Sequence, residues 1–168
     1  MKCYKGKLIV YQRTRKMTIY TFKERKAQNQ IDQFFEKFES NPVYSHDLNL
    51  ILAALQEFCR RGIDERRFRR QGEGAVDALA AGASNLRLYC APYGSDAIII
   101  GNGDYKTTRL VQNCPNCKPH WEFMMELDRE IQARIRNKDM YWETYINEQG
   151  IEQRKLSGDL YFELGDCD

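Results

Sequence analysis

The segment from residue 85 to 109, NLRLYCAPYGSDAIIIGNGDYKTTR, constrains the fold of this chain more than any other stretch. Apolar residues alternate with others in LRLYC (86–90), which is the period-two pattern of a half-buried strand. A Gly-Ser-Asp turn follows, and the run AIII then predicts a return strand that is buried on both faces. Such a hairpin places Arg87 on a strand face and Lys106 and Arg109 beyond the tip of the neighbouring strand. This arrangement of cations suits a phosphate group.

The length and composition are those of one globular domain. With 168 residues, of which 42% are hydrophobic and 30% charged, the chain is long enough to bury its own core. It has no apolar run of about 18 residues that could span a membrane. The apolar run near its N-terminus is shorter than the core of a signal peptide, which needs about 7–15 residues. We therefore expect a cytoplasmic protein with no membrane partner, in which the six cysteines are reduced.

Charge is distributed unevenly, although the net charge is only +2. Residues 1–118 hold 20 of the 26 Lys and Arg residues but only 12 of the 24 Asp and Glu residues. The basic front part can attract a polyanion, whereas the acidic last third can screen charge, form a partner surface or add solubility. A pI near 8.2 is low for a dedicated nucleic-acid binder, for which a pI above about 9 is usual.

Periodicity predicts further elements on both sides of the hairpin. Four apolar residues between Ile31 and Phe38 have the i, i+3, i+4, i+7 spacing of a helix that buries one face. A second helix is capped by Ser45 or Asp47 and ends at Gly62. A third helix has Trp121 near its start and ends near residue 137. Strands are expected at 7–11, 17–22 and 160–164. The segment 75–80 fits either a strand or a helix. This order of elements predicts an α+β fold with a small antiparallel sheet.

The motif LRLYC, followed by III and then by GNGDYKTTR, resembles the RelE/HigB-like toxins of bacterial type II toxin–antitoxin pairs. The resemblance covers about residues 17–137, so residues 1–16 and the acidic residues 138–168 are N- and C-terminal extensions that can each add a strand. It implies a helical hairpin packed on a small twisted antiparallel sheet with a C-terminal helix. It also implies a ribonuclease that cuts translated mRNA in the ribosomal decoding site and is held off by an antitoxin.

The resemblance also implies roles for single residues. Arg87 matches a strand arginine that contacts the scissile phosphate, and either Lys106 or Arg109 matches a basic residue at the strand end. Tyr89 lies in a strand position where the family often has tyrosine. The catalytic Tyr or His that the family carries near its C-terminal end has no clear counterpart in this chain.

RNA can be cleaved without a metal ion when its 2′-hydroxyl attacks the adjacent phosphorus and the 5′-oxygen leaves. Cations help because charge grows on the phosphate oxygens, and a Tyr or Lys of lowered pKa can move the proton. We therefore expect Arg87 to clamp the phosphate, and Lys106 or Arg109 to stabilise its charge or act as the acid. Tyr89 or Tyr105 would carry the proton, with no cofactor. In the alternative, Arg87 is a solvated strand residue and the basic pair is a polar turn.

A dense basic segment precedes the hairpin and consists of Arg66, Arg67, Arg69 and Arg70. Four cations with only two carboxylates beside them repel one another, which favours contact with an anion. That anion is either the RNA backbone or an acidic segment of an antitoxin. The toxin resemblance assigns Arg69 or Arg70 to a basic loop, whereas the alternative is the solvent face of a helix end.

Cys114 and Cys117 form a Cys-x-x-Cys motif close to His120. A structural zinc site needs four ligands, and no second pair stands at matching spacing, so zinc is a minor alternative. A redox Cys-x-x-Cys opens a helix after a strand, whereas Pro119 follows here. We therefore expect two cysteines of an ordinary loop.

The sequence thus predicts the toxin component of a type II toxin–antitoxin pair. It would be a metal-independent endoribonuclease that acts on mRNA on the ribosome and binds a cognate antitoxin. Two other classes of protein stay open: a catalytically silent protein-binding module of the same fold, and a small Cys-x-x-Cys/His zinc-binding protein.

Overall fold

The computed structural model describes residues 1–70, 74–80 and 84–168. Within these residues the strands are β1 (Tyr4–Arg13), β2 (Thr18–Glu24), β3 (Phe68–Arg70), β4 (Asp77–Leu79), β5 (Leu86–Pro92), β6 (Ala97–Tyr105), β7 (Met140–Ile146), β8 (Glu152–Gly158) and β9 (Tyr161–Leu164). The α-helices are α1 (Gln30–Glu39), α2 (Ser45–Arg61) and α3 (Lys118–Arg136), and short 3-10 turns lie at Pro42–Tyr44, Glu65–Arg67 and Val111–Asn113.

Seven of these strands form one mixed sheet, in the order β3-β4-β5-β6-β2-β1-β9. β2 and β6 pair in parallel, with Thr18 opposite Ala97 and Thr21 opposite Ile100, whereas the other neighbours in this sheet are antiparallel. Both strands of the parallel pair are buried along most of their length, as expected for strands covered on both faces.

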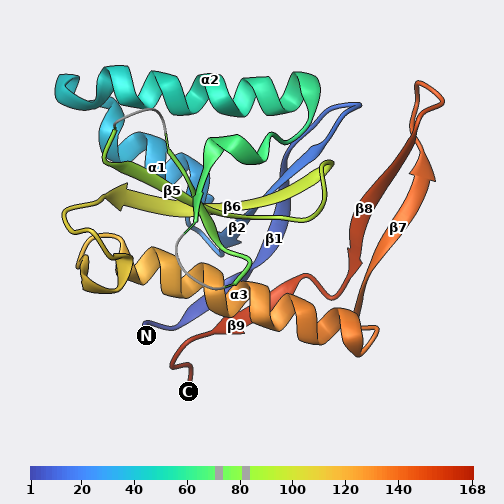
Figure 1. Ribbon diagram of the computed structural model, residues 1–168. Coiled ribbons are helices and arrows are strands. Elements are labelled where there is room, and N and C mark those ends of the chain that lie inside the picture. Colours follow the sequence, from blue (N-terminus) through green and yellow to red (C-terminus); the bar gives the residue numbers. More distant parts are fainter. Residues whose placement is uncertain (71–73, 81–83) are drawn as a thin grey trace.

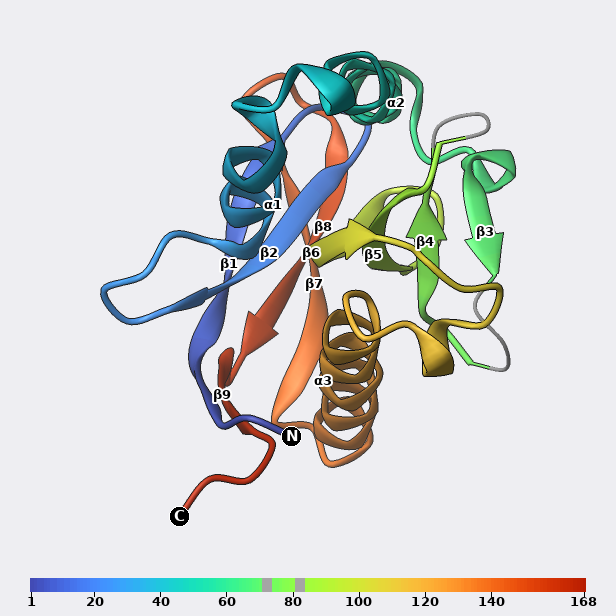
Figure 2. The same ribbon diagram turned by 90° about the vertical axis from the view of Figure 1, so that its left-hand side faces the viewer.

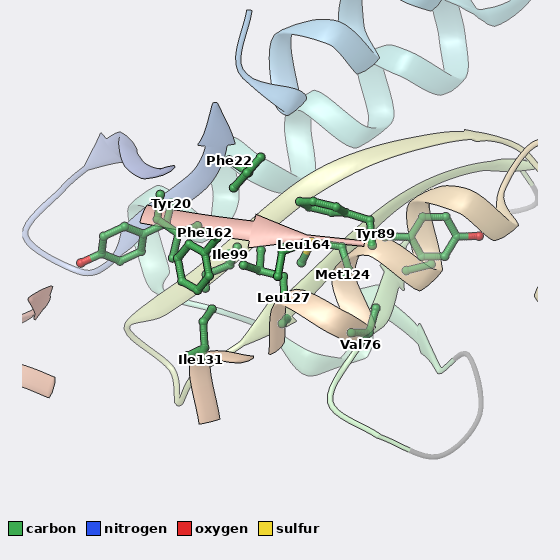
Figure 3. Packing of buried hydrophobic residues seen from close by; sticks show 14 of the residues in the cluster. Tyr20, Phe22, Val76, Tyr89, Ile99, Met124, Leu127, Ile131, Phe162 and Leu164 are labelled. Atoms are coloured by element: carbon green, nitrogen blue, oxygen red, sulfur yellow. The ribbon is translucent and has the colours of Figure 1, made fainter. Parts of the chain in front are cut away.

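The sheet is the middle one of three layers. Helices α1 and α2 cover one face and α3 covers the other (Figure 1). The alternation of side chains along β6 separates the two cores, because Ile98 and Ile100 pack with Phe34 of α1, whereas Ile99 packs with Leu127 of α3. Figure 3 shows the core on the α3 side.

The expected fold class is wrong in its sheet and in its last helix. The sheet has seven strands and is mixed, rather than small and antiparallel, and α3 is not C-terminal because β7, β8 and β9 follow it. In addition, helices lie on both faces instead of one helical hairpin on one face. The physical reason is that the outer segments carry buried apolar side chains of their own, with Leu8 in β1 and Phe162 and Leu164 in β9. These side chains add both strands to the sheet.

β7 and β8 form an antiparallel hairpin that stands beside the main sheet (Figure 1). Arg154 of β8 ties this hairpin to the turn between β5 and β6. Its Nε donates to the two carboxylate oxygens of Asp96 at 2.9 and 2.8 Å, and its Nη2 donates to the carbonyl of Tyr93. Its guanidinium also lies 4.2 Å from the ring centroid of Trp142.

A disulfide between Cys3 and Cys167 joins the two ends of the chain. It follows directly on the ladder between β1 and β9, in which Tyr4 faces Leu164. The expectation that all cysteines are reduced is therefore wrong for this pair. The free thiols are those of Cys59, Cys90, Cys114 and Cys117.

Candidate anion-binding site

The central hairpin gathers basic residues at one end of the sheet, where β5 begins, β6 ends and the chain turns toward α3 (Figure 2). Arg87 of β5 stands opposite Asp104 of β6. The backbone N–H of Lys106 donates to the carbonyl of Asn85 at 2.8 Å, which extends the hairpin pairing past the end of β6. This register brings Arg87 and Lys106 to the same end of the sheet.

Arg87 is a buried cation without a carboxylate partner among the interactions described. Only 6% of the residue is exposed, and its Nη1 donates to the carbonyls of Ser84 at 2.5 Å and Leu86 at 2.9 Å. Its Nε has no hydrogen-bond partner among the described residues. Burial lowers the pKa of the guanidinium, and the nearby positive charge of Arg69 lowers this pKa further. A desolvated cation with an unused donor favours an incoming anion.

Lys106 and Arg69 complete the group of cations, which we call the Arg87 cluster (Arg69, Arg87 and Lys106). Burial is the main cause that lowers the pKa of Lys106, and the positive charge of Arg87 is the second. These mutual effects on the pKa require the three cations to lie within electrostatic reach of one another. Lys106 is half-buried and Arg69 is exposed, so the cluster reaches solvent on their side.

Tyr89 lies behind this cluster rather than on the surface. It is completely buried, and its hydroxyl points away from the other labelled core residues (Figure 3). Burial raises the pKa of the phenol, and the neighbouring Cys117 thiol raises it further, although the hydroxyl has no hydrogen-bond partner among the described residues. The phenol therefore stays protonated at neutral pH and can donate a hydrogen bond, but it cannot act as a base.

The other two candidates from this hairpin lie apart from the cluster. Arg109 is exposed in the loop after β6, and its charge is not among those that shift the pKa of Arg87 or Lys106. The hydroxyl of Tyr105 accepts a hydrogen bond from Asn85 at 3.0 Å.

The arginine segment that precedes β4 does not act as one unit. Arg66 forms two hydrogen bonds of 3.0 Å with the carboxylate of Asp64, which neutralises it locally. Arg67 is exposed and lines a hollow of about 900 Å³ between α2 and β1. Arg69 joins the Arg87 cluster, and the side chain of Arg70 lies outside the described part of the structure.

Cys114 and Cys117 lie at the start of α3, both completely buried. Within the described residues there is no group of three or more His, Cys, Asp or Glu side chains that could hold a metal ion. His120 lies in the first turn of α3, and burial lowers its pKa to about 4, with a further lowering by the positive charge of Lys37. The imidazole is therefore neutral at pH 7.

Sequence reasoning missed a second basic surface, which we call the basic hollow. It encloses about 770 Å³ beside β1, the end of β2 and β9. Its cationic lining residues are Lys5, Lys7, Lys23, Arg25 and Lys26. Only Lys5 forms an ion pair within the described residues, with Glu163. The alternation of Lys5 and Lys7 on a strand was the available sequence signal, but pairing with β2 is what collects the five cations.

No family model, no curated protein and no solved structure matches this chain. Among the described residues, no helix is both long and apolar enough to cross a membrane. The function must therefore be argued from the side chains themselves.

Proposed function

We propose that this protein is a metal-independent endoribonuclease, the toxin component of a type II toxin–antitoxin pair. The observation that carries the proposal is the Arg87 cluster. A guanidinium that is 6% exposed, has an unused Nε donor and lies near the positive charge of Arg69 is costly without an anionic partner. A bound phosphodiester offsets this cost by supplying both the negative charge and the missing acceptor.

The reaction assigned to this cluster needs no cofactor. The 2′-hydroxyl of RNA gives its proton to water as its oxygen bonds to the adjacent phosphorus, and the bond from phosphorus to the 5′-oxygen breaks, which yields a 2′,3′-cyclic phosphate and a 5′-hydroxyl. Arg87 and Arg69 stabilise the charge that grows on the phosphate oxygens. Lys106 protonates the leaving oxygen, a role that suits an ammonium whose pKa is lowered by burial and by Arg87.

The rival function is a catalytically silent module that binds a protein, and one observation favours it. Tyr89, the expected proton carrier, is completely buried and its pKa is raised, so the cluster has no evident base to accept the proton of the 2′-hydroxyl. In this alternative the Arg87 cluster binds a carboxylate of an acidic partner segment.

The partners and the location belong to the same proposal. The substrate would be mRNA on the ribosome, the inhibitor would be a cognate antitoxin, and the compartment would be the cytoplasm. Disulfides are rare in a reducing cytoplasm, so a Cys3–Cys167 disulfide that is intact in protein extracted from cells would count against this compartment.

Cleavage of a translated mRNA in a cell-free system, with mapping of transcript 5′ ends, tests this proposal. Arg87→Met should lower the cleavage rate by about 10²–10³, the usual cost of removing one charge-stabilising donor. Arg129→Gln, which removes an exposed arginine of α3, is the matched control and should leave the rate unchanged. Cleavage that persists in Arg87→Met would refute the assignment. Tight binding of an acidic peptide without any cleavage would establish the rival.

A further inference from the structure

The Cys-x-x-Cys motif lies in the turn between the 3-10 turn at Val111–Asn113 and the long helix α3. Cys117 is the N-cap residue of the 19-residue α3, and its carbonyl accepts a hydrogen bond from the N–H of Trp121 at 3.0 Å. The carbonyl of Cys114 accepts the N–H of Lys118 at 2.9 Å. Pro119 lies in the first turn of α3, where a proline is tolerated because its missing N–H would have no helical partner. The proline therefore does not prevent a helix from following the motif directly.

The two thiols have opposite surroundings. The sulfur of Cys114 accepts the N–H of Thr107 at 3.5 Å and lies 3.6 Å from the hydroxyl of Thr107. Burial acts to raise the pKa of Cys114, but these contacts and hydrogen bonds from Cys117 outweigh it and lower the pKa to about 7. For Cys117, burial raises the pKa to about 12. The helix N-terminus and the charge of Lys106 also favour a thiolate here.

We propose that Cys114 and Cys117 form a redox-active dithiol that reduces disulfide substrates of low molecular weight. Three observations carry this: the spacing, the position at the helix N-terminus, and the donors directed at the sulfur of Cys114. Neither sulfur is needed by the nuclease reaction, so the inference does not rest on the proposed function. Cys114 itself is completely buried, although its neighbours Asn113 and Pro115 are exposed, so the exchange requires this surface turn to open.

The exchange proceeds in two balanced steps. The Cys114 thiolate attacks one sulfur of the substrate disulfide, which forms a mixed disulfide and releases the first substrate thiolate to take up a proton. The Cys117 thiol then loses its proton and attacks the sulfur of Cys114, which forms the Cys114–Cys117 disulfide and releases the second substrate thiol. The substrate gains the two electrons that the protein loses.

The test is a redox titration of the full chain with reduced and oxidised glutathione, followed by acid quenching, alkylation and peptide mapping. Mapping distinguishes a Cys114–Cys117 disulfide from the Cys3–Cys167 disulfide. We expect the first to form reversibly as the fraction of oxidised glutathione rises. Its absence at every ratio, in protein that remains folded by circular dichroism, overturns the proposal.

Single variants test the order of attack. Cys117→Ser should accumulate glutathione on Cys114, whereas Cys114→Ser should accumulate little glutathione on Cys117. Cys59→Ser is the matched control, because Cys59 is a half-buried free thiol away from α3 whose pKa is raised by burial. Equal trapping on both cysteines, or alkylation of Cys114 only in denaturant, would count against the proposal. If the serine variants do not fold, the titration of the unaltered chain still decides.

Discussion

Loss of the Cys3–Cys167 disulfide should lower the stability of this protein by a large and calculable amount. The bond joins residues 164 positions apart, so it closes nearly the whole chain into a loop in the unfolded state. The chain-entropy relation gives roughly 5 kcal/mol for a loop of this length, as an upper value. For a protein of this size each kcal/mol corresponds to about 2–4 °C in the melting temperature. The expected decrease is therefore up to about 10–20 °C.

The assay is thermal unfolding with and without reductant, for the unaltered chain and for the double variant Cys3→Ser/Cys167→Ser. Reductant should lower the melting temperature of the unaltered chain to that of the variant and should leave the variant unchanged. The folded state should survive, because the β1–β9 ladder from Tyr4 to Lys7 does not include the disulfide. If the disulfide is present by mass spectrometry and its reduction leaves the melting temperature unchanged, the reasoning from loop entropy fails.

Three further predictions concern the fold and the site. Gly103→Ala should lower the free energy of unfolding by more than about 4 kcal/mol in a denaturant titration, because an ideal Cβ would lie 1.8 Å from the carbonyl oxygen of Arg87. A denaturant midpoint equal to that of the unaltered chain would contradict this. Arg154→Met should lower stability by roughly 1–3 kcal/mol through the unpaired Asp96 and should speed hydrogen exchange in β7 and β8; unchanged exchange would show that the ion pair does not hold the hairpin. His120 has a pKa of about 4 in the folded state against an ordinary 6.5, so the unfolded state binds more protons between these values. The free energy of unfolding should rise by at most about 3 kcal/mol from pH 4 to 6.5 and then stay level. If the same rise with pH persists in His120→Gln, other groups cause it.

Local patterns predicted the helices well because each helix has one apolar stripe. Ile31, Phe34 and Phe38 are all buried in α1. The start of α2 at Ser45 is close to the expected one, but the expected cap is wrong, because the N-cap residue is Tyr44 and no side chain caps this helix. The ambiguous segment at 75–80 contains the short strand β4. A prediction of this kind needs only residues that are close in sequence.

Pairing between distant strands could not be predicted in the same way. The parallel contact of β2 with β6 joins Thr18 to Ala97 across two helices and three strands, and no local pattern specifies it. The Arg87 cluster shows the same limit, because Arg87 and Lys106 follow from the hairpin, whereas Arg69 reaches them only through the order of β3, β4 and β5. Cys114 and Cys117 lie outside the helix, as expected, but Pro119 does not end the local structure, because it stands in the first turn of α3.

The topology explains why the charged groups meet at this end of the sheet. β2 and β6 are parallel neighbours, and β2 is followed by α1 on one face whereas β6 leads to α3 on the other. Adjacent parallel strands whose connections leave on opposite faces open a crevice beyond their carboxyl ends, which is where open α/β sheets bind ligands. Lys37 of α1 bridges this position, because its Nζ donates to the carbonyl of Gly103 at 2.8 Å and lies 3.2 Å from the carboxylate of Asp104. Side chains from both helix layers therefore set the electrostatics at the end of β6. Lys37→Met should raise the pKa of His120, which an NMR titration of the imidazole measures. An unchanged pKa in the variant would show that the two helix layers act independently.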